Sequence, residues 1–137
     1  MAKNIRTGLE DLTVDECWNM LGRTTVGRLA VSISNRPDIF PVNYRVDNET
    51  IVVRTAPGLK LAAATLGPEV AFEVDELDAM RHTGWSVVIK GPAEELNELG
   101  ERLEAEALKV EPWSDAERDR YFRITPEHIT GRRIPGS

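Results

Sequence analysis

Short segments in which apolar and polar residues alternate, separated by residues that favour turns, are the feature that most constrains the fold of this chain. Segments 26–33, 39–46 and 50–55 all alternate with a period of two, and Ser-Asn-Arg-Pro and Asp-Asn-Glu stand between them. Because this period places apolar side chains on one face of a strand, the first half of the chain is predicted to form an antiparallel meander over a core.

The second half of the chain continues the pattern and adds helices. A Thr-x-x-Glu capping box at Thr13 predicts a short helix that ends at Gly22. Segments 59–66 and 94–108 also read as helices, and segment 75–82 reads as an acidic loop. Further strands are predicted at 70–74, 85–89, 121–125 and 129–134. The fold class is therefore mainly β, a small antiparallel barrel that closes to avoid free edges and carries a few flanking helices.

Length and composition bound the class of protein. A chain of 137 residues predicts a single domain over residues 1–137. Its net charge of −6 argues against nucleic-acid binding. No segment approaches the roughly 20 apolar residues of a membrane span, and the first residues lack the apolar core of a signal peptide. One cysteine and two histidines leave no disulfide and no Cys/His metal cluster. We expect a cytoplasmic protein without a metal.

Segment 54–61, Arg-Thr-Ala-Pro-Gly-Leu-Lys-Leu, is the strongest candidate for a binding site. A strand end delivers Arg54 and Thr55, a Pro-Gly turn exposes backbone amides, and a helix then begins with Lys60 in its first turn. A lysine at that end opposes the helix dipole, and a bound phosphate would explain its presence. The alternative is that Arg54 and Lys60 are exposed surface cations beside a tight turn.

Segment 41–44, Pro-Val-Asn-Tyr, is the second candidate. Proline cannot donate to a strand ladder, so Pro41 indicates an edge or a bulge, and Asn43 needs a polar partner. A backbone of this kind suits a flat heteroaromatic ligand with imide edges. An edge strand with a solvent-facing Asn43 is the alternative.

Several other residues remain ambiguous from the sequence. Cys17 is predicted to be a buried small hydrophobe. Trp85 opens a strand and favours a core position, whereas Trp113 fits a pocket or the core equally. Arg132 and Arg133 could form a clamp for a phosphate or carboxylate, or a basic tail.

Taken together, these motifs resemble the pyridoxamine 5′-phosphate oxidase-like, flavin-binding split-barrel family, which includes flavin and deazaflavin oxidoreductases. The resemblance extends from about residue 12 to residue 134, and the combination of Pro-Val-Asn-Tyr with the later Arg-Thr-Ala-Pro-Gly-x-Lys block is its most specific part. The residues that carry it are segments 25–30, 40–44, 54–61, 83–88, 123–126 and 129–133.

The resemblance implies a six-stranded split barrel that forms a homodimer with two cofactor sites at the subunit interface. It places the cofactor phosphate at Arg54, Thr55 and Lys60, with Ala56 and Leu61 beside them. It places the ring along Val42, Asn43 and Tyr44, and the partner chain contributes aromatic or basic groups, for which Trp85 and Trp113 are the candidates.

FMN is the expected cofactor, with a deazaflavin coenzyme as the alternative because both present a phosphate and a tricyclic ring. The expected function is an FMN-dependent oxidoreductase. The alternatives are a deazaflavin-dependent reductase and a non-catalytic flavin carrier. The chain is shorter than a typical pyridoxamine 5′-phosphate oxidase and lacks a convincing pyridoxal-phosphate-binding set, so the substrate and the catalytic residues stay open. The expected partners are a second copy and the cofactor, without nucleic acid or membrane.

Overall fold

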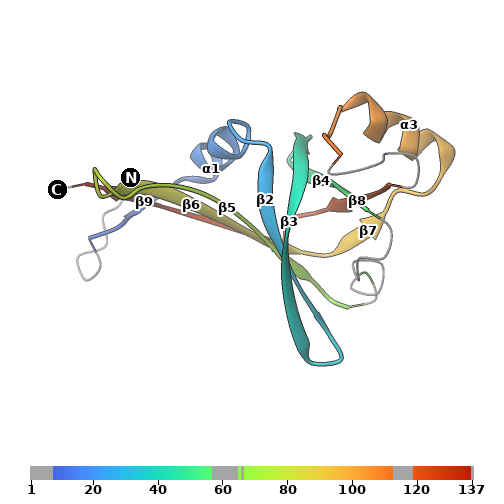
Figure 1. Cartoon of the computed structure of the whole chain (residues 1–137), viewed down its shortest axis with the longest axis horizontal. Helices are drawn as coiled ribbons and strands as arrows, with labels where there is room; N and C mark the ends of the chain where they lie inside the picture. The colour runs from blue at the N-terminus through green and yellow to red at the C-terminus, as the bar shows by residue number, and fades with distance from the viewer. Residues whose placement is uncertain (1–7, 57–64, 66, 113–118, 137) are drawn as a thin grey trace.

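The computed structural model describes residues 8–56, 65, 67–112 and 119–136. These residues form one sheet of antiparallel strands in the order β1-β9-β6-β5-β2-β3-β4-β8-β7, with two helices beside it (Figure 1). In chain order the elements are β1 (Glu10–Asp11), α1 (Val14–Leu21), β2 (Val26–Ile33), β3 (Arg36–Asp47), β4 (Thr50–Thr55), β5 (Val70–Asp78), β6 (Thr83–Gly91), β7 (Ala93–Glu95), α3 (Leu99–Ala107), β8 (Arg120–Ile124) and β9 (His128–Pro135).

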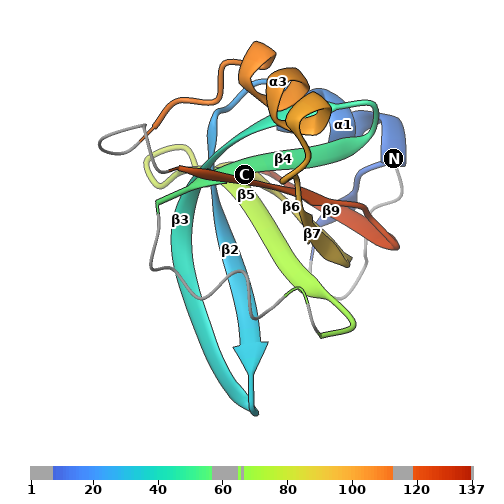
Figure 2. The same cartoon turned by 90° about the vertical axis from the view of Figure 1, so that its right-hand side faces the viewer.

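The strand pairings form a ring, because β6 and β7 are two halves of one bent strand on either side of Pro92. The first half, β6, pairs with β5, and the second half, β7, pairs with β8. The ring therefore runs β2, β3, β4, β8, β7–β6 and β5, and back to β2. This confirms the predicted split barrel, while β9 and β1 extend the sheet beyond β6. Figure 2 shows the β2–β3 hairpin projecting from this curled sheet.

The bend in the long strand depends on a close contact at Gly91. Lys90 pairs with His128 and Ala93 with Ile124, and the strand bends between these two pairs. A Cβ atom at Gly91 would lie 2.0 Å from the carbonyl oxygen of Thr125. The two strands can cross at this distance only because residue 91 has no side chain.

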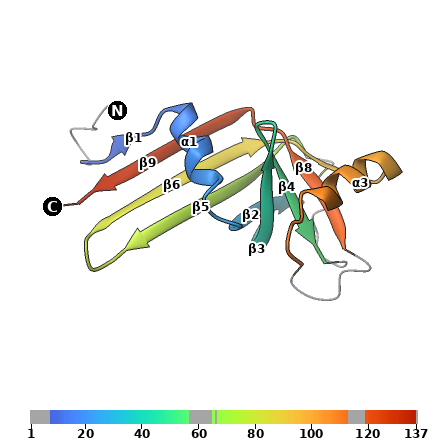
Figure 3. The ribbon, with the colours of Figure 1, turned by 90° about the horizontal axis from the view of Figure 1, so that it is seen from above.

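Helix α1 covers one face of the extended part of the sheet. Its predicted capping box is confirmed, since the Thr13 hydroxyl accepts from the Glu16 amide at 3.2 Å and Glu16 Oε1 accepts from the Thr13 amide at 2.9 Å. Cys17 is buried, as predicted, and the helix packs on β6 and β9 (Figure 3). Neither helix in the described residues has the length and apolar character needed to cross a membrane.

Two predictions for the second half of the chain are wrong. Segment 75–82 is not a loop throughout, because β5 continues to Asp78 and pairs there with Thr83. Segment 94–108 is not one helix, since residues 93–95 pair with β8 as β7 and α3 begins only at Leu99. In α3, Leu99 and Leu103 are 75% and 56% exposed, and the helix packs through Ala105. The predicted helix at 59–66 lies almost entirely outside the described residues.

Candidate functional site

The β3 segment predicted to follow the cofactor ring is held firmly by the core. Val42 and Tyr44 are buried in the core, each 1% exposed. The Tyr44 hydroxyl donates to the carbonyl oxygen of Leu21 at 2.6 Å, its ring meets Phe72 edge to face at 5.0 Å, and burial raises its pKa. Of the three residues predicted to lie along the cofactor ring, Asn43 alone has a side chain that contacts the residues after α3, at Glu111. A ligand along this strand would therefore meet the backbone rather than the side chains of Val42 and Tyr44.

One edge of β3 is open along part of its length. Residues 36–43 pair with β2, whereas pairing with β4 covers only residues 43–47. Among the described residues, Pro41 and Val42 therefore have a neighbouring strand on one side alone. An open edge presents backbone N–H and C=O groups that can pair with another molecule. Pro41 fits this position because a proline is tolerated at a strand edge.

Arg54 lies directly opposite Asn43 in the β3–β4 ladder. Both side chains donate hydrogen bonds to residues that lie between α3 and β8. Arg54 donates from Nε to Asp119 Oδ2 at 2.8 Å and from Nη1 to the Val110 carbonyl oxygen at 2.8 Å. The guanidinium carbon lies 5.4 Å from the centre of the Tyr121 ring. Asn43 Nδ2 donates to the Glu111 carbonyl oxygen at 2.6 Å. A guanidinium has five N–H groups, so these contacts leave donors for a further acceptor.

The remaining residues of the predicted phosphate site divide between two faces of β4. Thr55 is 3% exposed and follows Arg54 in the strand, so the two side chains point to opposite faces. Ala56 comes directly after β4 and is half-buried. Lys60, Leu61 and Trp113 lie outside the described residues.

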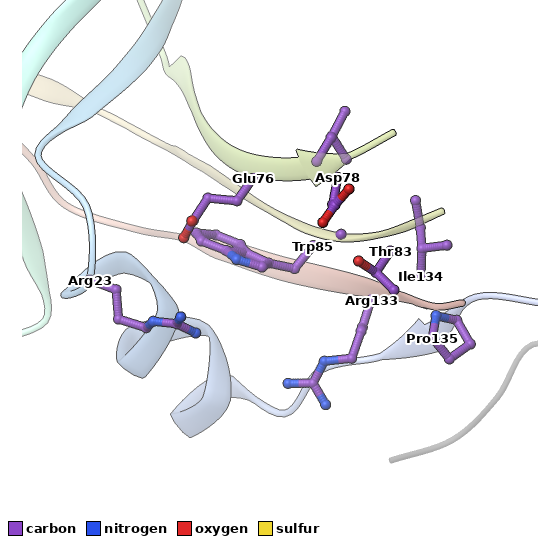
Figure 4. A pocket seen from close by; sticks show the side chains of 10 residues that line it. Arg23, Glu76, Asp78, Thr83, Trp85, Arg133, Ile134 and Pro135 are labelled. Atoms are coloured by element: carbon purple, nitrogen blue, oxygen red, sulfur yellow. The ribbon is translucent and has the colours of Figure 1, made fainter. Parts of the chain in front are cut away.

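Trp85 borders a cavity of about 400 Å³ on the side of the sheet that carries α1. Its indole is 7% exposed and belongs to the core, and it also forms part of the cavity wall. In Figure 4, Arg23 and Arg133 lie on one side of the indole and Glu76 on the other. The cavity thus combines an aromatic wall with both signs of charge, which suits a polar ligand better than an apolar one.

The two candidate regions lie on opposite sides of the molecule. The Trp85 cavity lies where β5, β6 and β9 extend away from the barrel (Figure 1). Arg54 and Asn43 instead contact residues 110 and 111, which follow α3. A single chain does not bring these residues together.

The proposed pairing of Arg132 with Arg133 as one clamp is wrong. Both lie in β9, where successive side chains point to opposite faces. Arg133 borders the Trp85 cavity, and Arg132 lies on the other face of the sheet. Asp119 is the site residue that sequence reasoning missed, because nothing near it in the sequence indicates a partner 65 residues away.

Neither metal nor thiol chemistry finds support in the described part of the chain. It contains no group of three or more His, Cys, Asp or Glu side chains that could hold a metal ion. Burial raises the pKa of the Cys17 thiol and so disfavours the thiolate that acts as a nucleophile.

Comparisons with known proteins agree with this geometry. Residues 13–133 match the model of a family described as pyridoxamine 5′-phosphate oxidase. The chain is 34% identical over 129 residues to the uncharacterized protein Rv0080 of Mycobacterium tuberculosis, covering 90% of this chain and 84% of the relative.

Two solved structures show the same fold. One, of a Corynebacterium glutamicum protein, has a TM-score of 0.81 and 35% identity and covers 94% of this chain and 95% of that one. The other is described as the FAD binding protein from Mycobacterium smegmatis, with a TM-score of 0.77 and 35% identity, covering 90% of this chain and 98% of that one.

Proposed function

Because the chain belongs to the pyridoxamine 5′-phosphate oxidase family, we propose that it is a flavin-dependent oxidoreductase that binds FMN and works as a homodimer. The observation that carries the proposal is the open edge of β3 at residues 36–42, which ends where Asn43 pairs with Arg54. Among the residues that the structure describes, this arrangement leaves backbone groups of β3 without a strand partner next to β4, which leads into segment 54–61.

The residues present fit such a cofactor. The carbonyl oxygen of Pro41 at this edge would accept from the polar edge of the ring, and the buried side chains of Val42 and Tyr44 keep that backbone rigid. Thr55 and Lys60 would hold the phosphate, and Arg54 would add its remaining N–H groups. Ala56 and Leu61 flank this phosphate site in the sequence. When bound, the flavin supplies hydride or electron transfer, while the protein binds and orients it.

A second copy of the chain would complete the site. Trp85 lies on the far side of the molecule from Arg54, so within one chain it cannot reach a ligand held there. In a two-fold dimer the same two surfaces meet twice, which gives two equivalent sites. Trp85, and Trp113 from the segment before Asp119, are the side chains that the partner would contribute.

The test is a binding titration with FMN, FAD and a deazaflavin coenzyme side by side. FAD is included because the similar Mycobacterium smegmatis protein is described as FAD-binding. At about a hundred times its dissociation constant a ligand adds about 2.7 kcal/mol to the free energy of unfolding, so thermal unfolding detects binding readily. The absence of any shift and of a bound-flavin spectrum for all three would refute the proposal. The ligand that binds with the lowest dissociation constant identifies which of the three cofactors the protein uses.

A reduction experiment separates the oxidoreductase from a flavin carrier. The loaded protein is mixed with NADH, NADPH or reduced deazaflavin in a stopped-flow instrument, and the flavin absorbance is followed. Fast reduction, followed by reoxidation by an organic acceptor, is expected of the oxidoreductase. A flavin that binds tightly and stays oxidised with every donor would favour the carrier.

A further inference from the structure

Trp85 carries a hydrogen-bond donor that no described residue uses. Its side chain is more than nine-tenths buried, with 7% exposed, and it borders the cavity of about 400 Å³ on the α1 side of the sheet. The indole N–H group makes no hydrogen bond with the residues that the structure describes. In Figure 4 the indole nitrogen lies on the edge of the ring that faces Arg23 and Arg133. Because the N–H group of a buried tryptophan normally has a partner, this one points to a ligand with an acceptor atom in the cavity.

The register of the sheet explains why a cavity forms beside Trp85. Trp85 on β6 pairs with Glu76 on β5 and with Arg133 on β9, so the three side chains form one row on the same face. Two residues before Arg133 on β9 lies Gly131, where the absence of a side chain leaves room for α1. The helix therefore covers the neighbouring row, and the row of Trp85 lies beside it. Arg23, which follows α1, borders the cavity from the helix side.

Positively charged donors gather on one side of the indole. Arg23 forms no ion pair with a described residue, and its guanidinium donates there only to the thioether sulfur of Met20, at 3.4 Å from Nη1. A thioether is a weak acceptor, so most of the five N–H donors of Arg23 remain for a stronger one. Arg133 adds a second positive charge, which Glu10, directly across from it in the β1–β9 ladder, partly offsets. Arg23 is therefore the cation on which a ligand would act most.

The acidic groups of the cavity come from another strand. Glu76 and Asp78 both lie on β5, and Glu76 lies on the side of the indole away from Arg23 and Arg133 (Figure 4). The Asp78 carboxylate accepts from two backbone N–H groups of the turn before β6, at 3.0 and 3.1 Å, so it is held at that turn. Ile134 and Pro135 add apolar surface to the wall. The cavity thus offers donors at one end, a carboxylate at the other and apolar contact as well.

We propose that this cavity binds the carboxylate of a small organic acid, which accepts from the Trp85 N–H group and from Arg23. A carboxylate has two oxygens and can meet both donors at once. A volume of about 400 Å³ with apolar surface exceeds what a single inorganic anion needs and is in the range of small-molecule sites. Glu76 disfavours a second negative charge on the ligand, which favours a monocarboxylate.

The acid is assigned as the substrate of the oxidoreductase, and this assignment rests on the proposed function. In the proposed dimer Trp85 of one copy lies at the flavin ring held by the other, so a ligand bound beside the indole would also lie beside the ring. The binding of a carboxylate to the cavity does not depend on the flavin, since every residue that carries it belongs to one chain.

The test follows the indole N–H signal of Trp85 by two-dimensional ¹H–¹⁵N NMR while benzoate is added to the full chain. The chain has three tryptophans, and Trp85→Phe identifies the signal by its loss. Benzoate should move this signal downfield, because the N–H group gains a charged acceptor. Benzamide is the matched control ligand, since it has the same ring and a similar shape without the charge. It should bind at least about tenfold more weakly than benzoate.

Two substitutions with opposite expected effects test the roles of the charges. Arg23→Gln should weaken benzoate binding by about ten- to a hundredfold, whereas Glu76→Gln, which removes a negative charge, should bind benzoate at least as tightly as the wild type. Arg36→Gln is the matched control, because it makes the same change as Arg23→Gln on the exposed β2–β3 hairpin, and it should stay within about twofold of the wild type. All three positions are exposed, and thermal unfolding checks that each variant folds. An unmoved Trp85 signal, equal affinities for benzoate and benzamide, or equal affinities of Arg23→Gln and Arg36→Gln would each overturn the inference.

The same titration with FMN present separates this inference from the proposed function. Benzoate that moves the Trp85 signal in a chain that binds no flavin would keep the carboxylate site and remove the proposed function. A chain that binds flavin and shows no response of Trp85 to benzoate would remove this site alone. Where both ligands bind, benzoate should alter the visible absorption of the bound flavin. An unaltered flavin spectrum, or displacement of benzoate by FMN, would overturn the assignment of the acid as the substrate.

Discussion

Asp119 and Arg54 form an ion pair that fixes the segment after α3 against β4. Asp119 is 3% exposed and accepts from Arg54 Nε at 2.8 Å, while the side chain of Arg54 is 14% exposed. Arg54 also donates to the carbonyl oxygen of Val110, and its guanidinium lies over Tyr121. The second oxygen of Asp119, Oδ1, has no hydrogen-bond partner among the described residues. The pair therefore connects β4 to the residue that directly precedes β8, while the contact with Val110 connects β4 to the residues after α3.

Loss of the Asp119 carboxylate should destabilise the fold. Asp119→Ala leaves a mostly buried guanidinium without its counter-charge, and we expect a loss of about 2–4 kcal/mol in the free energy of unfolding. Asp119→Asn keeps an acceptor for Arg54 and should lose less. Urea denaturation of both variants measures the difference. A loss below about 0.5 kcal/mol in Asp119→Ala would mean that the pair behaves like an exposed one.

Gly91 should tolerate no side chain. In Gly91→Ala the new methyl group would overlap the backbone of Thr125, which cannot move aside without breaking the strand crossing. Overpacking of this kind costs about 1–3 kcal/mol, and a clash with backbone belongs at the upper end.

Gly100→Ala is the matched control, since nothing lies within 4 Å of a Cβ atom there and the residue is helical. It should be neutral or stabilise by up to about 1 kcal/mol. Equal midpoints of thermal unfolding for the two variants would contradict the account of the strand crossing.

The sequence predicts the barrel strands well because the alternation of apolar and polar residues along each strand indicates which face is buried. The predictions for residues 26–33 and 50–55 match β2 and β4 residue for residue. The predicted helix at 94–108 fails at Glu94 and Glu95, which fit a helix as well as a strand, and only pairing with β8 decides between the two. Local propensity cannot report a partner strand that lies far along the chain, as β8 does.

The candidate site was predictable in its chain positions and not in its side-chain partners. Proline at position 41 indicated a strand edge, and the structure places one there among the described residues. The contacts of Arg54 with Asp119 and Val110 join positions 65 and 56 residues apart, and no local pattern carries that information. The separation of Trp85 from Arg54 likewise follows from the topology and not from the motifs.

Stability should depend on pH through Glu73. Its pKa in the folded chain is raised to about 7, first through burial and then through its contact with Asp75, against 4.5 for the ordinary value. The folded state then binds more protons than the unfolded state between these values, so the free energy of unfolding should fall as pH rises from about 4.5 to 7. The pKa of Asp75 is lowered, so its contribution is lost only as pH falls below its ordinary value of 3.8.

The measurement is urea denaturation of the wild type and Glu73→Gln between pH 5 and 8. The slope should be present in the wild type and weaker in Glu73→Gln, which does not titrate. Identical slopes in the two proteins would show that another group is responsible.

Lys60 provides the sharpest test of the proposed phosphate site, and its placement rests on the sequence because it lies outside the described residues. Lys60→Gln removes a cation while keeping a long polar side chain. The lost charge-assisted contact with the phosphate should cost about 1.5–3 kcal/mol, roughly ten- to a hundredfold in FMN affinity. Stability without cofactor should be unchanged or slightly higher, because a lysine at a helix N-terminus opposes the dipole.

Lys90→Gln is the control for Lys60→Gln, since Lys90 is an exposed lysine on β6, away from β4, and the substitution makes the same charge change. It should leave FMN affinity within about twofold of the wild type, because one exposed charge far from a ligand is screened by salt. Titration by flavin fluorescence at one ionic strength compares the three proteins. If Lys60→Gln and Lys90→Gln bind FMN equally well, the phosphate is held elsewhere, and the roles of Thr55 and Arg54 in binding it must be reassigned along with that of Lys60.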